Sequence, residues 1–182
     1  RTEAMVFRPS AGTWYVRHED GSTEAIGFGG FGDTPVAGDF DRDGKTDLAL
    51  WHDATGVWTV RKSTGGLVTL AWGNPGDIPV AGDFDGDGAN DLAVFRPSDG
   101  MWHVKRSSWP ELHVQWGTSG DVPTAMDWDG DGMAELTVWR PTSGVWYGQN
   151  RWLADLGMPP QYYATQYGQL GDLVPARTVK PY

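Results

Sequence analysis

The sequence contains no cysteine among its 182 residues, so disulfides and thiolate metal sites are excluded. It also lacks any run of 18 apolar residues, which argues against a membrane-spanning helix. Helix-favouring residues are sparse, whereas glycine and tryptophan, with 26 and 11 copies, are abundant. This mixture predicts short strands separated by many turns.

Basic residues are few as well. The formal net charge is −10 and the pI is about 4.6, so phosphate-rich partners such as nucleic acid or an anionic membrane surface are disfavoured. Twelve of the 24 acidic residues lie in three short loops. Three divalent cations bound there, six positive charges in all, would bring the net charge from −10 to −4. We therefore interpret the acidity mainly as a set of metal ligands.

A unit of 44 residues recurs along the chain. Each of the three acidic loops opens on an aspartate, and these aspartates are 44 residues apart; the same period links four tryptophans, each two residues after a glycine. Because the rings recur in register, we expect them to pack between repeats rather than to bind a ligand. The fourth unit departs from the pattern by an insertion at roughly 151–163. The repeated tryptophans are Trp14, Trp58, Trp102 and Trp146.

Each unit is predicted to form four short strands, which in the third unit are 79–84, 91–95, 100–105 and 111–116. Alternation is clear around Trp102, which shares one face with Val104. Four strands in a unit of about 40–45 residues match the dimensions of a propeller blade. A lone blade cannot bury both faces of its sheet, so we expect the blades to pack around an axis.

We predict an all-β fold: a single β-propeller domain of four four-stranded blades over 1–182. The pattern starts at the second strand of the first unit, so we expect the C-terminal segment to supply the missing strand and close the ring. Thr178 would stand in the closing loop where Asp39 stands, so that loop would hold no metal. A fragment of a larger ring is the alternative. The expected blades are 1–31 with 173–179, 32–75, 76–119, and 120–172.

Each aspartate loop offers five candidate ligands at alternate positions 1, 3, 5, 7 and 9, counted from its first aspartate. Positions 1, 3, 5 and 9 carry carboxylates, and position 7 would contribute its backbone carbonyl. A glycine at position 6 permits the positive φ that such a tight turn needs. The candidates are Asp39, Asp41, Asp43, Lys45 and Asp47; Asp83, Asp85, Asp87, Ala89 and Asp91; and Asp127, Asp129, Asp131, Met133 and Glu135.

A site of oxygen atoms alone, with several negative charges and no histidine or cysteine, suits calcium best among the common cations. Without a cation, carboxylates held this close would repel one another. An EF-hand starts similarly but needs an acid at position 12 and flanking helices, whereas position 12 here is Leu50, Val94 or Val138 within β-type runs. We therefore predict three bound calcium ions; acidic turns without an ion are the alternative.

The three loops and the strands after them, DFDRDGKTDLALW, DFDGDGANDLAVF and DWDGDGMAELTVW, resemble the FG-GAP or VCBS-type repeats of integrin-like β-propellers. Phe28-Gly29 and Trp72-Gly73 resemble the FG element, and the resemblance covers nearly the whole chain. It implies a calcium loop between the first two strands of each blade, in agreement with the register above. Family members often have about seven blades, however, and the GAP element is replaced here.

Calcium in these loops would stabilise the blades by pinning the first strand to the second. Extracellular modules often bind calcium with a Kd of about 10⁻⁴ to 10⁻³ M, so such sites stay filled only where calcium is plentiful. We therefore expect a secreted or cell-surface protein, and the resemblance implies a bacterial one.

Aromatic residues that interrupt the repeat are the candidates for ligand binding: Trp109 in a turn, and Trp152, Tyr162 and Tyr163 in the insertion. Exposed rings near polar groups can stack on the apolar face of a sugar; a structural role for the insertion is the alternative. We expect a lectin- or adhesin-like module for carbohydrate or an extracellular protein. An accessory domain of a larger secreted enzyme is the alternative, and the oligomeric state is left open.

Catalytic motifs are missing from the sequence: it has no GxSxG, HExxH or phosphate-binding glycine loop. We therefore expect no enzyme, although a glycosidase pair among acids such as Glu19 and Glu111 is the third alternative.

Two polar pairings are also expected. His103 and His113 should face each other across neighbouring strands, and two histidines alone are too few ligands for a zinc site. Repeated arginines are expected to pair with repeated acids: Arg8, Arg96 and Arg140 with Asp33, Asp77, Asp121 and Asp172.

Overall fold

The computed structural model describes residues 4–170 and 172, and within them the chain is almost entirely β-structure. A 3₁₀ turn, η1 (Pro9–Ala11), and a four-residue helix, α1 (Trp152–Asp155), complete the elements. The strands are β1 (Ala4–Arg8), β2 (Thr13–Arg17), β3 (Thr23–Gly27), β4 (Asp33–Gly38), β5 (Asp47–His52), β6 (Val57–Arg61), β7 (Leu67–Ala71), β8 (Ile78–Gly82), β9 (Asp91–Arg96), β10 (Met101–Lys105), β11 (Leu112–Gln115), β12 (Val122–Met126), β13 (Glu135–Arg140), β14 (Val145–Asn150) and β15 (Gln161–Gln166).

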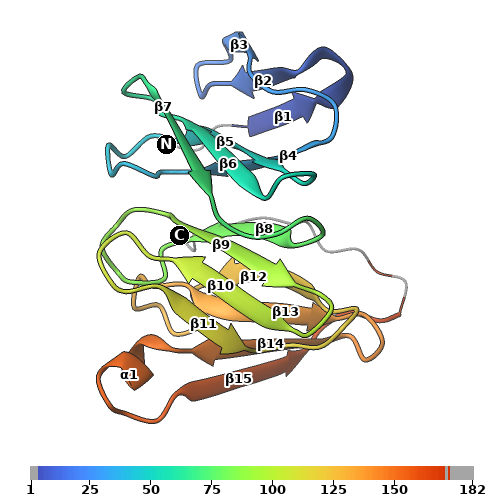
Figure 1. Ribbon diagram of the computed structural model, residues 1–182, viewed down its shortest axis with the longest axis vertical. Coiled ribbons are helices and arrows are strands. Elements are labelled where there is room, and N and C mark those ends of the chain that lie inside the picture. The colour runs from blue at the N-terminus through green and yellow to red at the C-terminus, as the bar shows by residue number, and fades with distance from the viewer. Residues whose placement is uncertain (1–3, 171, 173–182) are drawn as a thin grey trace.

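These strands form four antiparallel sheets that follow one another in chain order (Figure 1). The first sheet has the order β1-β2-β3, and the other three have four strands each, β4 to β7, β8 to β11 and β12 to β15. The prediction of four-stranded units is confirmed for the last three sheets. The strand predicted at 173–179 lies outside the described residues, so ring closure stays a prediction.

An equivalent aromatic pair joins two neighbouring strands in every sheet: β1 and β2 in the first sheet, and the second and third strands in the other three. Trp102 lies opposite Phe95 in the register of β9 and β10, and their ring centroids are 5.5 Å apart. The equivalent pairs in the other sheets have centroids 5.3, 5.5 and 6.2 Å apart. Cross-strand aromatic pairs stabilise a sheet. The predicted packing between repeats is confirmed for Trp14, Trp58 and Trp102, which lie in core clusters that join neighbouring sheets; Trp146 is only partly buried and lies in none of these clusters.

The hydrophobic core consists of three clusters, and each cluster joins two neighbouring sheets. The largest has ten buried residues and packs Phe95 and Trp102 of the third sheet against Leu136 and Val138 of the fourth. The second includes Trp51 and Trp58 of the second sheet and Val94 of the third. The third cluster has only Trp14, Leu48 and Leu50 fully buried, and it joins the first two sheets.

Glycine before each repeated tryptophan allows a close approach of two backbones. A Cβ on Gly100 would lie 2.3 Å from the carbonyl oxygen of Gly117, and Gly100 has a φ of 70°. The same contact recurs in all four sheets, at 2.1 to 2.4 Å. Any larger residue there would force the end of the outer strand away from the blade.

The innermost strands of neighbouring sheets lie side by side: β8 contacts both β4 and β12. Within the described residues, no helix has the length and apolar character to cross a membrane.

Candidate metal centre

The aspartate loops join the first and second strands of the second, third and fourth sheets. In the second loop, Gly86 and Gly88 donate backbone N–H bonds to the two carboxylate oxygens of Asp83, at 2.7 and 2.8 Å. The residues at positions 4 and 6 make the same two bonds in the other loops. Each turn is therefore built around its first aspartate, as in an Asx-turn.

Carboxylates at alternate positions converge in every loop. Three of them bring one oxygen each to within 4.8 Å of one another, so one cation could contact all three. The convergence predicted from the spacing is therefore observed, but the members differ between loops. The clusters are Asp39, Asp41 and Asp43 in the first loop, Asp83, Asp85 and Asp91 in the second, and Asp127, Asp129 and Glu135 in the third.

Three predicted acids lie outside these clusters, and each interacts with another group. Asp47 accepts the N–H of Ser63 at 2.7 Å. Asp87 forms an ion pair with Arg42 of the preceding loop, and Asp131 accepts the N–H of position 7 at 2.8 Å. The N–H groups of the other position-7 residues, Lys45 and Ala89, bond to position 5 in the same way. The ligand role of the position-7 carbonyls of Lys45, Ala89 and Met133 stays a prediction.

The acid at position 9 is buried in every loop: Asp47, Asp91 and Glu135 are each 1% exposed. Its carboxylate accepts the N–H of the position-2 residue, at 2.6 to 2.9 Å. Burial, reinforced by the neighbouring carboxylates, raises the pKa of Asp91 to about 7 and that of Glu135 to about 8. Burial also raises the pKa of Asp47. A bound cation would favour the ionised form of these acids.

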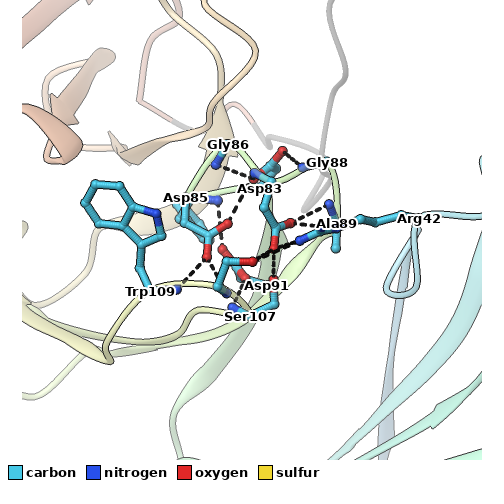
Figure 2. A network of polar contacts seen from close by, with 12 residues as sticks. Arg42, Asp83, Asp85, Gly86, Gly88, Ala89, Asp91, Ser107 and Trp109 are labelled. Atoms are coloured by element: carbon cyan, nitrogen blue, oxygen red, sulfur yellow. Dashed lines mark hydrogen bonds and ion pairs between the residues drawn. The ribbon is translucent and has the colours of Figure 1, made fainter.

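The turn between the third and fourth strands packs against each loop and donates hydrogen bonds to it. In the third sheet, the backbone N–H groups of Ser107 and Ser108 bond to Asp91 and Asp85, at 2.7 and 2.8 Å (Figure 2). Both hydroxyl groups also bond to Asp87. These donors hold the carboxylates in place around the cluster, as the outer shell of a metal site does.

In the fourth sheet, residues of β14 and β15 take over this role. The side chain of Asn150 donates to Asp129 at 3.1 Å, and the hydroxyl group of Tyr163 donates to the same oxygen at 2.8 Å. The Tyr163 ring stacks on Trp128 with an interplanar angle of 7°. Tyr163 therefore supports the third acidic loop, and the sequence analysis had assigned it to ligand binding.

The first loop contains an unsatisfied oxygen. Oδ1 of Asp41 is buried and has no hydrogen-bond partner within the described residues, while Oδ2 accepts the hydroxyl group of Thr64 at 2.6 Å. A buried carboxylate oxygen without a donor is costly unless a cation is close. Together with the all-oxygen donor set, this atom indicates that the residues fit a hard cation such as calcium.

Neighbouring loops are linked directly. Asn90 at position 8 of the second loop donates its N–H to the Asp39 carbonyl oxygen at 2.6 Å, and its side chain accepts the Asp39 N–H at 3.0 Å. Ala134 makes the first of these bonds to Asp83. Sequence analysis missed both Asn90 and Arg42. Arg42 has a φ of 65° where the other loops have glycine, which marks it as unusual.

The candidate ligand-binding aromatics do not form one surface. Trp109 lies beside the second loop, with the Arg106 guanidinium 5.5 Å from its ring centroid (Figure 2). Tyr162 is 61% exposed and contacts Trp116, with centroids 5.5 Å apart. Tyr162 and Tyr163 are consecutive in β15 and therefore face opposite sides of the sheet. The side chain of Trp152 lies outside the described part of the structure.

Two smaller expectations are tested by hydrogen bonds. His103 and His113 are opposite each other in β10 and β11, with their Nδ1 atoms 2.8 Å apart. Both predicted arginine–aspartate pairs in the third and fourth sheets form through two hydrogen bonds of 2.8 to 3.1 Å. Arg8 differs, since it donates to Tyr15 at 2.8 Å, and His52 takes the arginine's place beside Asp33 at 2.6 Å.

Neither a protein-family model nor a curated protein sequence matches the chain. Solved structures do match: a streptogramin B lyase has a TM-score of 0.58 at 9% identity, over 88% of this chain and 50% of that protein. Virginiamycin B lyase from Staphylococcus aureus has a TM-score of 0.57 at 10% identity, with 88% and 51% coverage. A catalytically inactive variant of that lyase with quinupristin matches at 0.56 and 9%, with 87% and 54% coverage.

The chain thus spans about half the length of the solved structures that it matches. At 9 to 10% identity these matches concern the fold, which is that of a β-propeller. The neighbours are enzymes, whereas the sequence led us to expect none; at this identity the conflict is weak. Similarity to FG-GAP or VCBS-type repeats stays a prediction. The chain is a β-propeller-like array of four sheets that carries three clusters of carboxylates at equivalent positions.

Proposed function

We propose that the chain is a calcium-stabilised β-propeller module whose three aspartate loops each bind one calcium ion. The observation that carries the proposal is the convergence of three carboxylates within 4.8 Å in every loop, at the same place in each sheet. Backbone and hydroxyl donors from the neighbouring turn orient these groups, and calcium would supply the charge that balances them. Its role would be structural, since the loops join adjacent strands and adjacent sheets.

Thermal unfolding tests this proposal. We expect saturating calcium to raise the Tm and a chelator to lower it, because an ion that binds only the folded chain stabilises it by mass action, by about 2.7 kcal/mol at a hundredfold excess over the Kd. The variants Asp85→Asn and Asp129→Asn should each remove part of this effect. Asp99→Asn, outside the loops, is the matched control. Equal Tm values with calcium and with chelator would refute the proposal.

We further propose that the module is secreted or displayed at the cell surface of a bacterium, where it binds carbohydrate or an extracellular protein. Weak calcium sites stay filled outside the cell, which supports this location. Tyr162 and the partly buried Trp116 offer an aromatic pair at the outer edges of the third and fourth sheets, and such pairs suit the apolar face of a sugar. Trp109 and Trp152 stay candidates beside them.

Glycan-array binding of the wild type and of Tyr162→Ala tests the ligand class. We expect the wild type to bind a glycan and Tyr162→Ala to bind it about tenfold more weakly. The reason is that stacking of a ligand on one aromatic ring, as measured for nucleic-acid bases, contributes about 1–3 kcal/mol. Leu170→Ala is the control, since that side chain is also exposed, at 76%. Glycan binding that survives Tyr162→Ala would contradict this surface. A stable protein partner without glycan binding would favour the accessory-domain alternative.

A further inference from the structure

A cleft of about 590 Å³ lies between the first and second sheets, beside the first aspartate loop. Its apolar lining comes from both sheets, and the core cluster at this interface is the smallest of the three. Its volume lies within the range of about 300 to 1,000 Å³ that is typical of small-molecule sites, and its lining is part apolar and part polar. The apolar residues that line it are Met5, Val16, Ile26, Phe28, Leu48 and Leu67.

The rim of this cleft is basic although the protein as a whole is acidic. Lys45, Arg61 and Lys62 line it, and only one acid, Glu24, does so. Glu24 lies 3.8 Å from His18, on the side of the first sheet. Across residues 4–170 and 172, the side chains of Arg61 and Lys62 make no hydrogen bond or ion pair. Two cations therefore stand next to an apolar surface, and no described side chain serves as their counter-ion.

In the third sheet, the two equivalent positions also carry cations, and both of them have carboxylate partners. One repeat later, Lys105 stands in place of Arg61 and bonds to Glu111 at 2.6 Å. Arg106 stands in place of Lys62 and forms an ion pair with Asp155 of the insertion. In the second sheet the counterpart of Glu111 is Leu67, which is 63% exposed. The second sheet thus keeps the cations of the repeat but lacks their carboxylate partners.

We propose that the cleft binds a small amphipathic anion, whose head group takes the place of the missing carboxylates beside Arg61 and Lys62. Its apolar body would cover the surface of Ile26, Phe28 and Leu48. The head group should be a single carboxylate or sulfate, because the guanidinium group of arginine and the ammonium group of lysine bind such oxygen atoms by charge-assisted hydrogen bonds. A polyanion is disfavoured by the net charge of −10. The proposal does not depend on calcium binding.

Titration calorimetry of the full chain with octanoate, octyl sulfate and 1-octanol tests this site. We expect one binding event for at least one of the two anions, and about tenfold weaker binding of the neutral alcohol, because a charge-assisted pair contributes about 1.5–3 kcal/mol. The double variant Arg61→Gln/Lys62→Gln should lose about tenfold in affinity for the anion. Arg17→Gln removes one positive charge from β2 outside the cleft and should bind as the wild type does.

A second variant gives Arg61 the carboxylate partner that the equivalent Lys105 has in the third sheet. Leu67→Glu would place a carboxylate beside Arg61, as Glu111 stands beside Lys105, and should weaken anion binding about tenfold. Leu67 also lines the cleft, so Leu67→Gln, which removes the same apolar side chain without adding a charge, is the matched control and should weaken binding clearly less. Leu67 is exposed, so neither change threatens the fold. Three results would each overturn the proposal: no binding of either anion, equal binding of the alcohol, or unchanged affinity in the double variant.

Discussion

The interface between the third and fourth sheets and the interface between the first and second come from one repeat but differ in packing. The former buries ten hydrophobic residues in a continuous cluster, and the latter buries three. At position 7 of the aspartate loop that faces the preceding sheet, the second sheet has the exposed Lys45, which lines the cleft. The fourth sheet has the partly buried Met133 there, which packs against Gly86 of the third sheet. A charged side chain at this position keeps the first interface open.

What the two interfaces share is the part of the repeat that builds a single sheet. The aromatic pair Phe7–Trp14 of the first sheet is as close as the pair Phe95–Trp102 of the third, at 5.3 and 5.5 Å. The aromatic contacts within each sheet therefore recur in every repeat, whereas the contacts between neighbouring sheets vary. Individual blades can acquire clefts or extra contacts without loss of their own fold.

The largest expected difference concerns the tryptophans of the two interfaces. Trp102→Ala should lower the free energy of unfolding by about 4–5 kcal/mol, because it empties the centre of the largest cluster, and Trp14→Ala by about 2–3 kcal/mol. Urea unfolding followed by circular dichroism measures both. Equal losses would mean that the cleft does not weaken the packing around Trp14.

The next effect is a pH dependence of the calcium-free protein. The pKa values of Asp91 and Glu135 are raised to about 7 and about 8 in the folded chain, whereas the unfolded chain releases these protons near pH 4. The folded state therefore holds more protons between about pH 4 and pH 8, so stability should fall by a few kcal/mol as pH rises through this window.

Calcium provides the control for this pH dependence. A bound cation stabilises the ionised carboxylates, so the decline should largely disappear when calcium is added. Asp91→Asn should also flatten the curve of the calcium-free protein. A stability that rises with pH in the presence of a chelator would contradict the burial of these acids.

A smaller effect separates a closed ring from an arc of a larger one. The closed ring predicted from the sequence would bring Asp172 beside Arg8, as Asp77 stands beside Arg96 in the third sheet. A double-mutant cycle on Arg96 and Asp77 should give a coupling of about 1–2 kcal/mol. Closure predicts a similar coupling for Arg8 and Asp172. The absence of coupling there would favour the larger ring.

The smallest effect concerns position 8 of the loops. Asn90→Ala should cost about 1 kcal/mol, because its side chain accepts the Asp39 N–H across the second and third sheets. Thr46→Ala, the same position at the first interface, should change stability by less than about 0.5 kcal/mol. Thermal unfolding of both variants checks this, and an equal loss would show that Thr46 has a comparable partner.

Much of the blade was predictable from the sequence because the signals are local and repeated. Strand alternation, the glycine before each tryptophan and the alternate aspartates fixed the sheets and the convergence of carboxylates. The membership of each cluster was not predictable from the spacing, because every loop carries acids at the same positions, yet position 5 joins the cluster in the first loop and position 9 in the other two. The bond from Tyr163 to Asp129 was not predicted either, because the two residues are 34 positions apart. A ligand-binding role for Tyr163 stays a prediction.

The cleft escaped the sequence analysis because it arises from differences between aligned repeats. The sequence period shows Leu67 in place of Glu111, and Lys45 in place of Ala89 and Met133. The sequence period identified equivalent positions, but it did not reveal which side chains lose a partner. Departures from the repeat are therefore the most informative residues for function.

Counting bound ions tests the central claim most directly. Native mass spectrometry at millimolar calcium should detect three calcium ions per chain, and the variant Asp83→Asn/Asp85→Asn should retain two, because it disables one cluster. A wild-type chain that carries no calcium under these conditions, or a variant that carries as many ions as the wild type, would contradict the account.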